Sequence, residues 1–151
     1  MIEYIKNKEK LLAVIVRANY KQKEGIEFFT PPDSTQQIGC VCHKKGTVVA
    51  AHVHNKVKRE VLYTHETLII KSGKIRVDFY DNNKNYVVSN EIEKGDVILF
   101  TDGAHGFKYL EDTQLIEIKQ GPYLKTEDKI RFKGIKDDEV LLKWLMNSNV
   151  R

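Results

Sequence analysis

The sequence predicts an all-β fold, a barrel or sandwich of six to ten antiparallel strands with one helix at its C-terminal end. Two observations predict it. Up to residue 122, short runs rich in β-branched residues are separated by Gly, Pro, Asn and Asp at intervals of about 8–12 residues. After residue 137, the apolar residues recur instead with a helical period. A chain of 151 residues predicts a single domain, residues 1–151, which is long enough to bury a core.

The expected strands are the apolar, β-branched runs between the turn signals. They cover residues 11–18, 26–30, 37–43, 48–54, 61–71, 74–80, 86–92, 97–101 and 113–120. Ser72 and Gly73 predict a tight turn between two of them. A helix is expected over about 137–147, capped by Asp137, and it either packs on the outside of the barrel or docks a partner.

Composition restricts the possible functions. With 41% hydrophobic and 30% charged residues, the chain is typical of a globular protein in water. The net charge of +4 is too small and too scattered for nucleic acid, although it favours the approach of an anionic substrate. No apolar run approaches the length of a membrane span, and the N-terminus lacks a signal-peptide core. We therefore expect no membrane partner and a cytoplasmic location, where Cys40 and Cys42 would be reduced core residues rather than a metal or redox pair.

Two histidines one residue apart are the strongest chemical signal. In a β-strand, His52 and His54 would project from the same face, so their imidazoles could converge on one metal ion. His105 follows a later apolar strand and lies between glycines, which allow the backbone to approach a site closely. We expect His105 to act as a metal ligand or as an acid/base.

A carboxylate is expected to join these histidines, and the sequence offers two. Glu66 is preferred to Glu60 because Leu68 and Ile70 share its parity, so Glu66 would begin an inward-facing row and His65 would face outward. On the strand over 113–120, Ile116 and Ile118 are expected to face the core. Glu117 and Lys119 would then face outward, away from the site.

The spacing of these residues resembles the first motif of the cupin family, G-x5-H-x-H-x3/4-E-x6-G. Gly46, His52 and His54 match its first half, and Glu66 and Gly73 match its second half. The gap between His54 and Glu66 is eleven residues instead of three or four.

The second cupin motif, G-x5-P-x-G-x2-H-x3-N, is matched more loosely. Gly95, Gly103 and His105 are present, but Thr101 replaces the proline, Tyr109 replaces the asparagine and one spacer residue is missing. The resemblance covers a core of about 36–122, and it is closest to small bacterial cupins associated with surface-polysaccharide genes. It implies a double-stranded β-helix, the jelly-roll barrel.

The resemblance implies a site in which His52, His54, Glu66 and His105 bind one divalent metal: zinc, iron, manganese or nickel. It also implies an enzyme of polysaccharide biosynthesis, isomerase- or epimerase-like, that acts on a sugar or sugar nucleotide. His105 or His65 would move the proton, and related enzymes of that kind commonly work without a metal. A metal-dependent dioxygenase and a non-catalytic metal- or sugar-binding module are the alternatives.

A homodimer is also expected. The run over residues 11–18 is long and apolar, and as an edge strand it would promote aggregation unless a second copy covered it.

Overall fold

The computed structural model describes residues 1–122 and 129–143, and over these ranges the protein is all-β with antiparallel sheets, as predicted. One short 3₁₀ helix, η1 (Asp137–Glu139), follows the strands. The strands are β1 (Ile2–Asn7), β2 (Lys10–Val16), β3 (Gly25–Phe28), β4 (Gly39–Cys42), β5 (Glu66–Ser72), β6 (Lys74–Tyr80), β7 (Tyr86–Glu93), β8 (Val97–Phe100), β9 (Ala104–Tyr109) and β10 (Gln114–Lys119).

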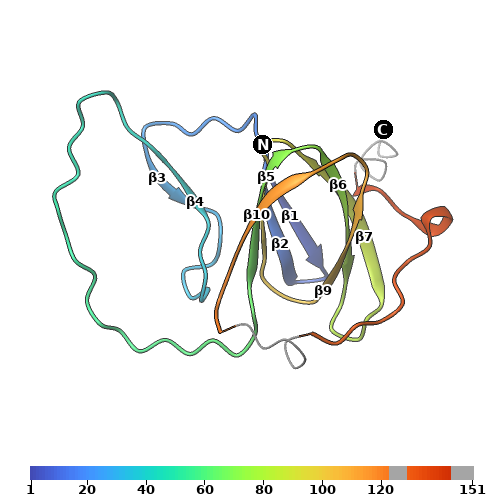
Figure 1. Ribbon diagram of the computed structural model, residues 1–151. Helices are drawn as coiled ribbons and strands as arrows, with labels where there is room; N and C mark the ends of the chain where they lie inside the picture. Colours follow the sequence, from blue (N-terminus) through green and yellow to red (C-terminus); the bar gives the residue numbers. More distant parts are fainter. Residues whose placement is uncertain (123–128, 144–151) are drawn as a thin grey trace.

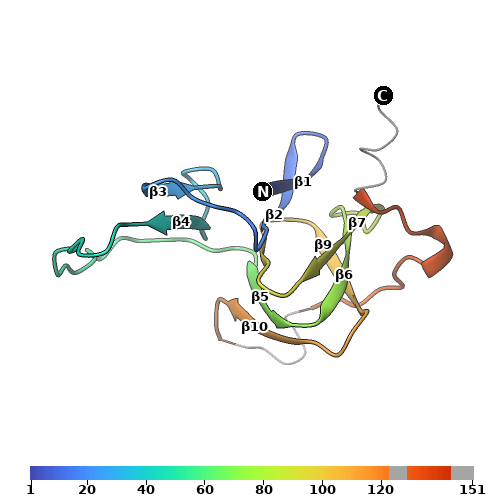
Figure 2. The ribbon, with the colours of Figure 1, turned by 90° about the horizontal axis from the view of Figure 1, so that it is seen from above.

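Two sheets form the body of the molecule. The larger has the strand order β1-β2-β8-β5-β10, and the smaller has the order β7-β6-β9. They curve around a common interior, while the β3–β4 hairpin stands to one side (Figures 1 and 2). Both β9 and β10 are therefore edge strands, each hydrogen-bonded to a neighbour on one side only.

The core lies between these two sheets. Ile75, Val77 and Phe79 alternate along β6 and are almost completely buried, and they pack with Leu68 and Ile70 of β5. The inward row predicted for β5 is thus confirmed. Strand alternation directs every second side chain of each sheet toward this interior, and at these positions of β5 and β6 the side chains are apolar.

The apolar run over 11–18 is not an exposed edge. It forms most of β2, which pairs with β8 on one side and with β1 on the other. The N-terminal strand β1 was not expected from the sequence, because Glu3, Lys6 and Asn7 interrupt its apolar residues. Since β1 covers β2, the reason given for a homodimer was wrong, and the dimer itself remains a prediction.

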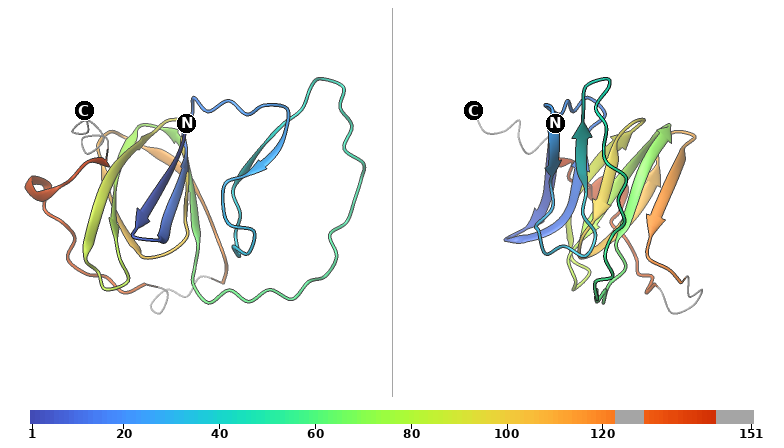
Figure 3. Two further views of the ribbon diagram at one scale, coloured as in Figure 1. Left: turned by 180° about the vertical axis from the view of Figure 1, so that it is seen from behind. Right: turned by 90° about the vertical axis from the view of Figure 1, so that its left-hand side faces the viewer.

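The strand expected over residues 48–54 is absent from this single chain. Residues 43–65, called the arm below, contain a turn at their start and no strand (Figures 1 and 3). Val48 and Val53 are each 87% exposed. A strand needs a neighbour to satisfy its backbone hydrogen bonds, and the arm contacts none here.

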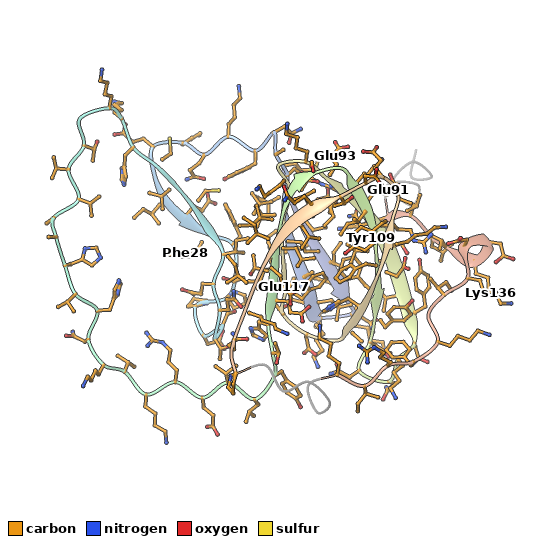
Figure 4. The ribbon with its side chains drawn as sticks, viewed as in Figure 1. Phe28, Glu91, Glu93, Tyr109, Glu117 and Lys136 are labelled. Atoms are coloured by element: carbon orange, nitrogen blue, oxygen red, sulfur yellow. The ribbon has the colours of Figure 1, made fainter. Side chains whose placement is uncertain are left out.

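The inward and outward faces of β10 are the reverse of those predicted. Glu117 pairs with Leu68 and Lys119 pairs with Glu66, so both lie on the interior face of the sheet (Figure 4 labels Glu117). Ile116 and Ile118 lie on the outer face and are 46% and 48% exposed. Hydrophobicity alone predicted the wrong face, because no other segment that the structure describes fully covers the outer pair, Ile116 and Ile118.

The C-terminal segment covers the outer face of β6 and β7. The ring of Phe132 packs edge-on against Tyr80, and the Tyr86 hydroxyl accepts a hydrogen bond from the backbone N–H of Leu141. Of the helix expected over 137–147, the described part contains η1, after which Val140 is extended, and Lys143 is the only other described residue in helical conformation. Residues 144–147 lie outside the described residues.

Two further expectations concern the cysteines and membranes. Cys40 and Cys42 lie on β4 and are free, and Cys40 packs beside a small second cluster around Val14 and Phe29. Among the described residues, no helix has the length and apolar character needed to cross a membrane.

Candidate functional site

The site is centred on a contact between Glu66 and His105, which are 39 positions apart in the sequence. Glu66 is the first residue of β5 and lies beside Phe100 of β8, while His105 lies on β9 opposite Phe79. Both side chains occupy interior positions of their sheets. His105 Nε2 lies 3.0 Å from Glu66 Oε2, so the two predicted site residues are brought together.

The local structure holds the histidine ring in place. The ring stacks on Phe100 with 4.0 Å between centroids. Gly103, two residues earlier, has φ +70°, and a Cβ there would lie 2.4 Å from the carbonyl oxygen of Tyr80. Only glycine allows this close turn. The turn brings β9 back along β6 and places His105 next to Glu66.

A third residue, Lys129, completes the polar cluster. Its ammonium group donates a hydrogen bond to the second carboxylate oxygen of Glu66 at 2.9 Å. The hydrogen bond from His105, together with that from Lys129, lowers the pKa of Glu66 to about 2, although burial opposes this. Glu66 is therefore an anion at neutral pH and can only accept hydrogen bonds.

The charge of Glu66 determines the tautomer of His105. Because the carboxylate accepts, Nε2 of His105 must carry the hydrogen that lies between them. In the neutral imidazole, Nδ1 then has the free lone pair. His105 is thus oriented by a buried anion and presents a basic nitrogen, the arrangement needed for a general base.

Two neighbouring cavities adjoin this cluster. One has a volume of about 450 Å³ and is lined by Glu66, His105 and Lys129 together with Tyr63 at the end of the arm. The other has a volume of about 580 Å³ and shares His105 and Lys129 with the first. His105 and Lys129 therefore adjoin both cavities, whereas Glu66 lines only the first.

The other two predicted metal ligands lie elsewhere. His52 and His54 are exposed in the arm, where their rings pack edge-on with 5.1 Å between centroids. Within the ranges 1–122 and 129–143, no group of three or more His, Cys, Asp or Glu side chains is placed to hold a metal ion. In this single chain, Glu66 contacts His105 and Lys129, and the binding of one metal by all four residues stays a prediction.

His65 and Glu60 are separate from the Glu66–His105 pair. His65 Nδ1 lies 3.2 Å from the hydroxyl of Thr35, and the backbone N–H of His65 donates to Gln120. With Glu60, His65 lines a different cavity of about 350 Å³. The choice of Glu66 over Glu60 as a metal ligand stays a prediction; of the two carboxylates, Glu66 is the one that contacts His105.

Several site residues could not be identified from the sequence. Lys129 lies in the polar run KTEDKIRFKG, which matches no motif. The stacking of Phe100 on His105 could not be predicted, because an apolar residue at the end of a strand is expected simply to fill the core. Glu117 and Lys119 were excluded because their neighbours are isoleucines, yet they share the interior face with Glu66. Only the register of β10 could have included them.

Acid should weaken the fold through Glu66. Its folded pKa is depressed from 4.5 to about 2, so its contribution is present above pH 4.5 and is lost as the pH falls toward 2. We expect wild type to lose about 2–3 kcal/mol more between pH 6 and pH 2 than Glu66→Gln, which does not titrate. Urea unfolding at a series of pH values measures the difference. Parallel pH profiles for the two proteins would contradict the assignment.

Comparisons with protein-family models, with curated proteins and with solved structures found no match to this chain.

Proposed function

We propose that the protein is an acid–base enzyme that acts on a small anionic, oxygen-rich substrate, such as a sugar nucleotide, in an isomerase- or epimerase-like reaction. The observation that supports it is the hydrogen bond between Glu66 and His105 at two adjoining cavities. A buried carboxylate that orients an imidazole is a recurring arrangement for moving a proton.

In the proposed reaction, Nδ1 of His105 removes a proton from a carbon next to a carbonyl group. The electron pair moves onto the carbonyl oxygen and forms an enolate. Where the first carbon carries a hydroxyl group, the imidazolium gives its proton to the former carbonyl carbon, and the hydroxyl proton passes to the former carbonyl oxygen, so that the new carbonyl forms at the first carbon. Epimerisation would instead need a second acid to protonate the first carbon from the opposite face. Glu66 remains ionised throughout and stabilises the imidazolium. Lys129 lies close enough to stabilise the negative charge that develops on the substrate oxygen.

The larger cavity favours a negatively charged substrate. Four cationic side chains line it, Arg76, Lys108, Lys129 and Arg131, against the single carboxylate of Asp78. Arg76 is paired with Asp78 and Asp137, whereas Arg131 makes no hydrogen bond or ion pair to the described part of the chain. Arg131 is therefore the cation available to a phosphate, which guanidinium groups bind well.

The arrangement of the two sheets supports a more specific description of the fold. We propose a cupin-type jelly-roll barrel, because two curved antiparallel sheets enclose an interior that holds Glu66 and His105. The motif resemblance supports the same family. A jelly-roll barrel alone does not determine chemistry, so the function rests on the site.

A divalent-metal centre is the second candidate function. His52 and His54 are only one residue apart, and imidazole plus carboxylate suits zinc, iron, manganese or nickel. A metal-dependent dioxygenase or a non-catalytic binding module would follow from it. In the described chain this candidate needs the arm to move to Glu66 and His105, so we assign no step of the reaction to a metal.

Binding of an anionic substrate can be tested at Arg131. We expect nucleoside diphosphate sugars to bind wild type and free sugars to bind much more weakly. Arg131→Ala should weaken nucleoside diphosphate sugar binding about 10-fold or more, because a charge-assisted hydrogen bond contributes about 1.5–3 kcal/mol. Isothermal titration calorimetry with a panel of both ligand classes measures this.

Lys133→Ala is the matched control. Lys133 is an exposed cation two residues from Arg131, and it does not line the cavity. Its replacement should leave affinity unchanged at constant ionic strength. An equal loss in both variants would show that only general charge matters, and failure of wild type to bind any ligand in the panel would contradict the substrate class.

A further inference from the structure

The barrel has an open wall between two edge strands. Within residues 1–122 and 129–143, β9 pairs only with β6, and β10 pairs only with β5. Apolar side chains are exposed along both edges: Phe107 and Tyr109 on β9, which are 38% and 58% exposed, and Ile116 and Ile118 on β10 (Figure 4 labels Tyr109). An unpaired edge with exposed apolar residues requires a covering strand, because it otherwise promotes aggregation.

Part of the arm has the sequence of a β-strand but pairs with no other strand in the structure. Its residues 48–54 are Val-Val-Ala-Ala-His-Val-His, rich in β-branched residues, and its exposed apolar side chains include Val49, Leu62 and Tyr63. An extended apolar segment of this length is uncommon in a compact domain unless it binds something. In the described part of the chain, β9 and β10 each have one unpaired edge, and the arm has no neighbouring strand.

The anchoring of the arm favours a second copy as its neighbour. Phe29, just after β3, packs with Val14 and Val16 of β2, which fixes the base of the β3–β4 hairpin on the large sheet. From there the arm extends away from the barrel, on the side opposite the C-terminal segment (Figures 1 and 3). A segment held in this direction can reach an identical barrel, and reciprocal exchange is a low-cost route to a twofold dimer.

Charge complementarity supports the same partner. The connection over residues 55–60 carries three cations, Lys56, Lys58 and Arg59, against the single carboxylate of Glu60. Two carboxylates flank the start of β9: Asp102 shortly precedes it, and Asp81 follows Tyr80, which pairs with Ala104. An arm that runs antiparallel to β9, with His54 near His105, would bring the basic connection near these two carboxylates on the other copy.

We propose that two copies of this chain exchange their arms, so that residues 48–54 of one copy pair with the free edge of β9 in the other. His52 and His54 lie at alternate positions, so one face of the added strand carries both. Next to β9, that face adjoins His105 and Glu66 of the other copy. The site is then built from two chains, which explains why one chain brings only half of the predicted ligands together.

The dimer is tested first by mass. Light scattering after gel filtration should give the mass of two chains at micromolar concentration. Ala50→Pro removes a backbone donor in the middle of the proposed added strand and should produce a folded monomer. Asn55→Pro, just beyond the proposed strand and without loss of a charge, is the matched control and should remain dimeric. A monomeric wild type, or a dimer that Ala50→Pro leaves intact, would overturn the exchange.

Exchange of site residues is tested with a mixed dimer and zinc alone as the probe. One chain carries His54→Ala and the other carries Glu66→Gln, with different affinity tags to isolate the mixed species. Wild type should bind about two zinc ions per dimer, and either variant homodimer should bind almost none. Exchange predicts about one zinc ion in the mixed dimer. One site would combine His54 of the Glu66→Gln chain with Glu66 of the His54→Ala chain, so both ligands are intact there. The other site would contain both substitutions.

Each other outcome contradicts a defined part of the proposal. No zinc in the mixed dimer would place His54 and Glu66 of each site in the same chain and overturn the exchange. No zinc in wild type would remove His52 and His54 from the site. This proposal rests on the Glu66–His105 site but not on its chemistry, since mass and zinc content are measured without any substrate.

Discussion

Replacing Phe100 by Ala is expected to lower the free energy of unfolding by about 3–5 kcal/mol. Phe100 is 4% exposed, and its ring packs against Phe79 in the core and stacks on His105. Truncation removes buried apolar surface and leaves a cavity beneath the histidine. Urea unfolding of both proteins at the same concentration measures the change, since the stability of a dimer depends on concentration.

Phe100→Leu is the control for the Phe100 prediction. Leu fills more of the space than Ala, so this variant should recover most of the lost stability. His105 should nevertheless be less well held, because an aliphatic side chain offers no flat surface for stacking. If Phe100→Ala cost less than about 1 kcal/mol, Phe100 would not be a core residue and the support of His105 would need another explanation.

Replacing Arg17 by Ala is expected to cost a similar amount, about 3–5 kcal/mol. The Arg17 guanidinium donates to Glu3 of β1 at 2.5 Å, to Asp96 before β8 at 2.7 Å and to Asn90 of β7 at 2.8 Å. It therefore ties the large sheet to the small one. Asp96 is 2% exposed, so losing Arg17 leaves an almost fully buried carboxylate without its cation.

Lys10→Ala is the control for Arg17. Lys10 also forms an ion pair, with Asp102 at 2.7 Å, but the lysine side chain is 54% exposed. Pairs of this kind contribute about 0–1 kcal/mol. Thermal unfolding should therefore separate the two variants clearly. Equal effects would show that the Arg17 network is no more important to stability than a surface pair.

The sequence predicted the parts of the fold that depend on local signals. The hairpin at Gly73 is present, and β6 covers the expected residues 74–80, because a positive-φ glycine between two apolar runs leaves few alternatives. The inward row of Glu66, Leu68 and Ile70 followed from strand alternation. Glu66 begins β5 and His105 lies on β9, and alternation places both side chains at interior positions, where they meet.

The parts that failed depend on contacts that no local pattern specifies. Ile116 and Ile118 were expected to face the interior, but the pairing of β10 with β5 directs Glu117 inward. Residues 48–54 have a strand pattern, yet a pattern cannot supply a neighbouring strand. Lys129 approaches Glu66 from 63 positions away. Such contacts depend on which strands and segments become neighbours in space, and the positions of turns in the sequence do not determine this.

The central claim is that His105, oriented by Glu66, moves a proton of the substrate. Solvent-exchange measurement in D₂O tests it most directly, with nucleoside diphosphate keto-sugars and free keto sugars as substrates. We expect wild type to incorporate deuterium at a carbon next to the carbonyl, as detected by mass spectrometry and NMR. His105→Gln should slow incorporation at least about 100-fold. His65→Gln should leave it unchanged, because His65 lines a different cavity. Incorporation by His105→Gln at the wild-type rate, or no incorporation by wild type with any substrate in the panel, would contradict the claim.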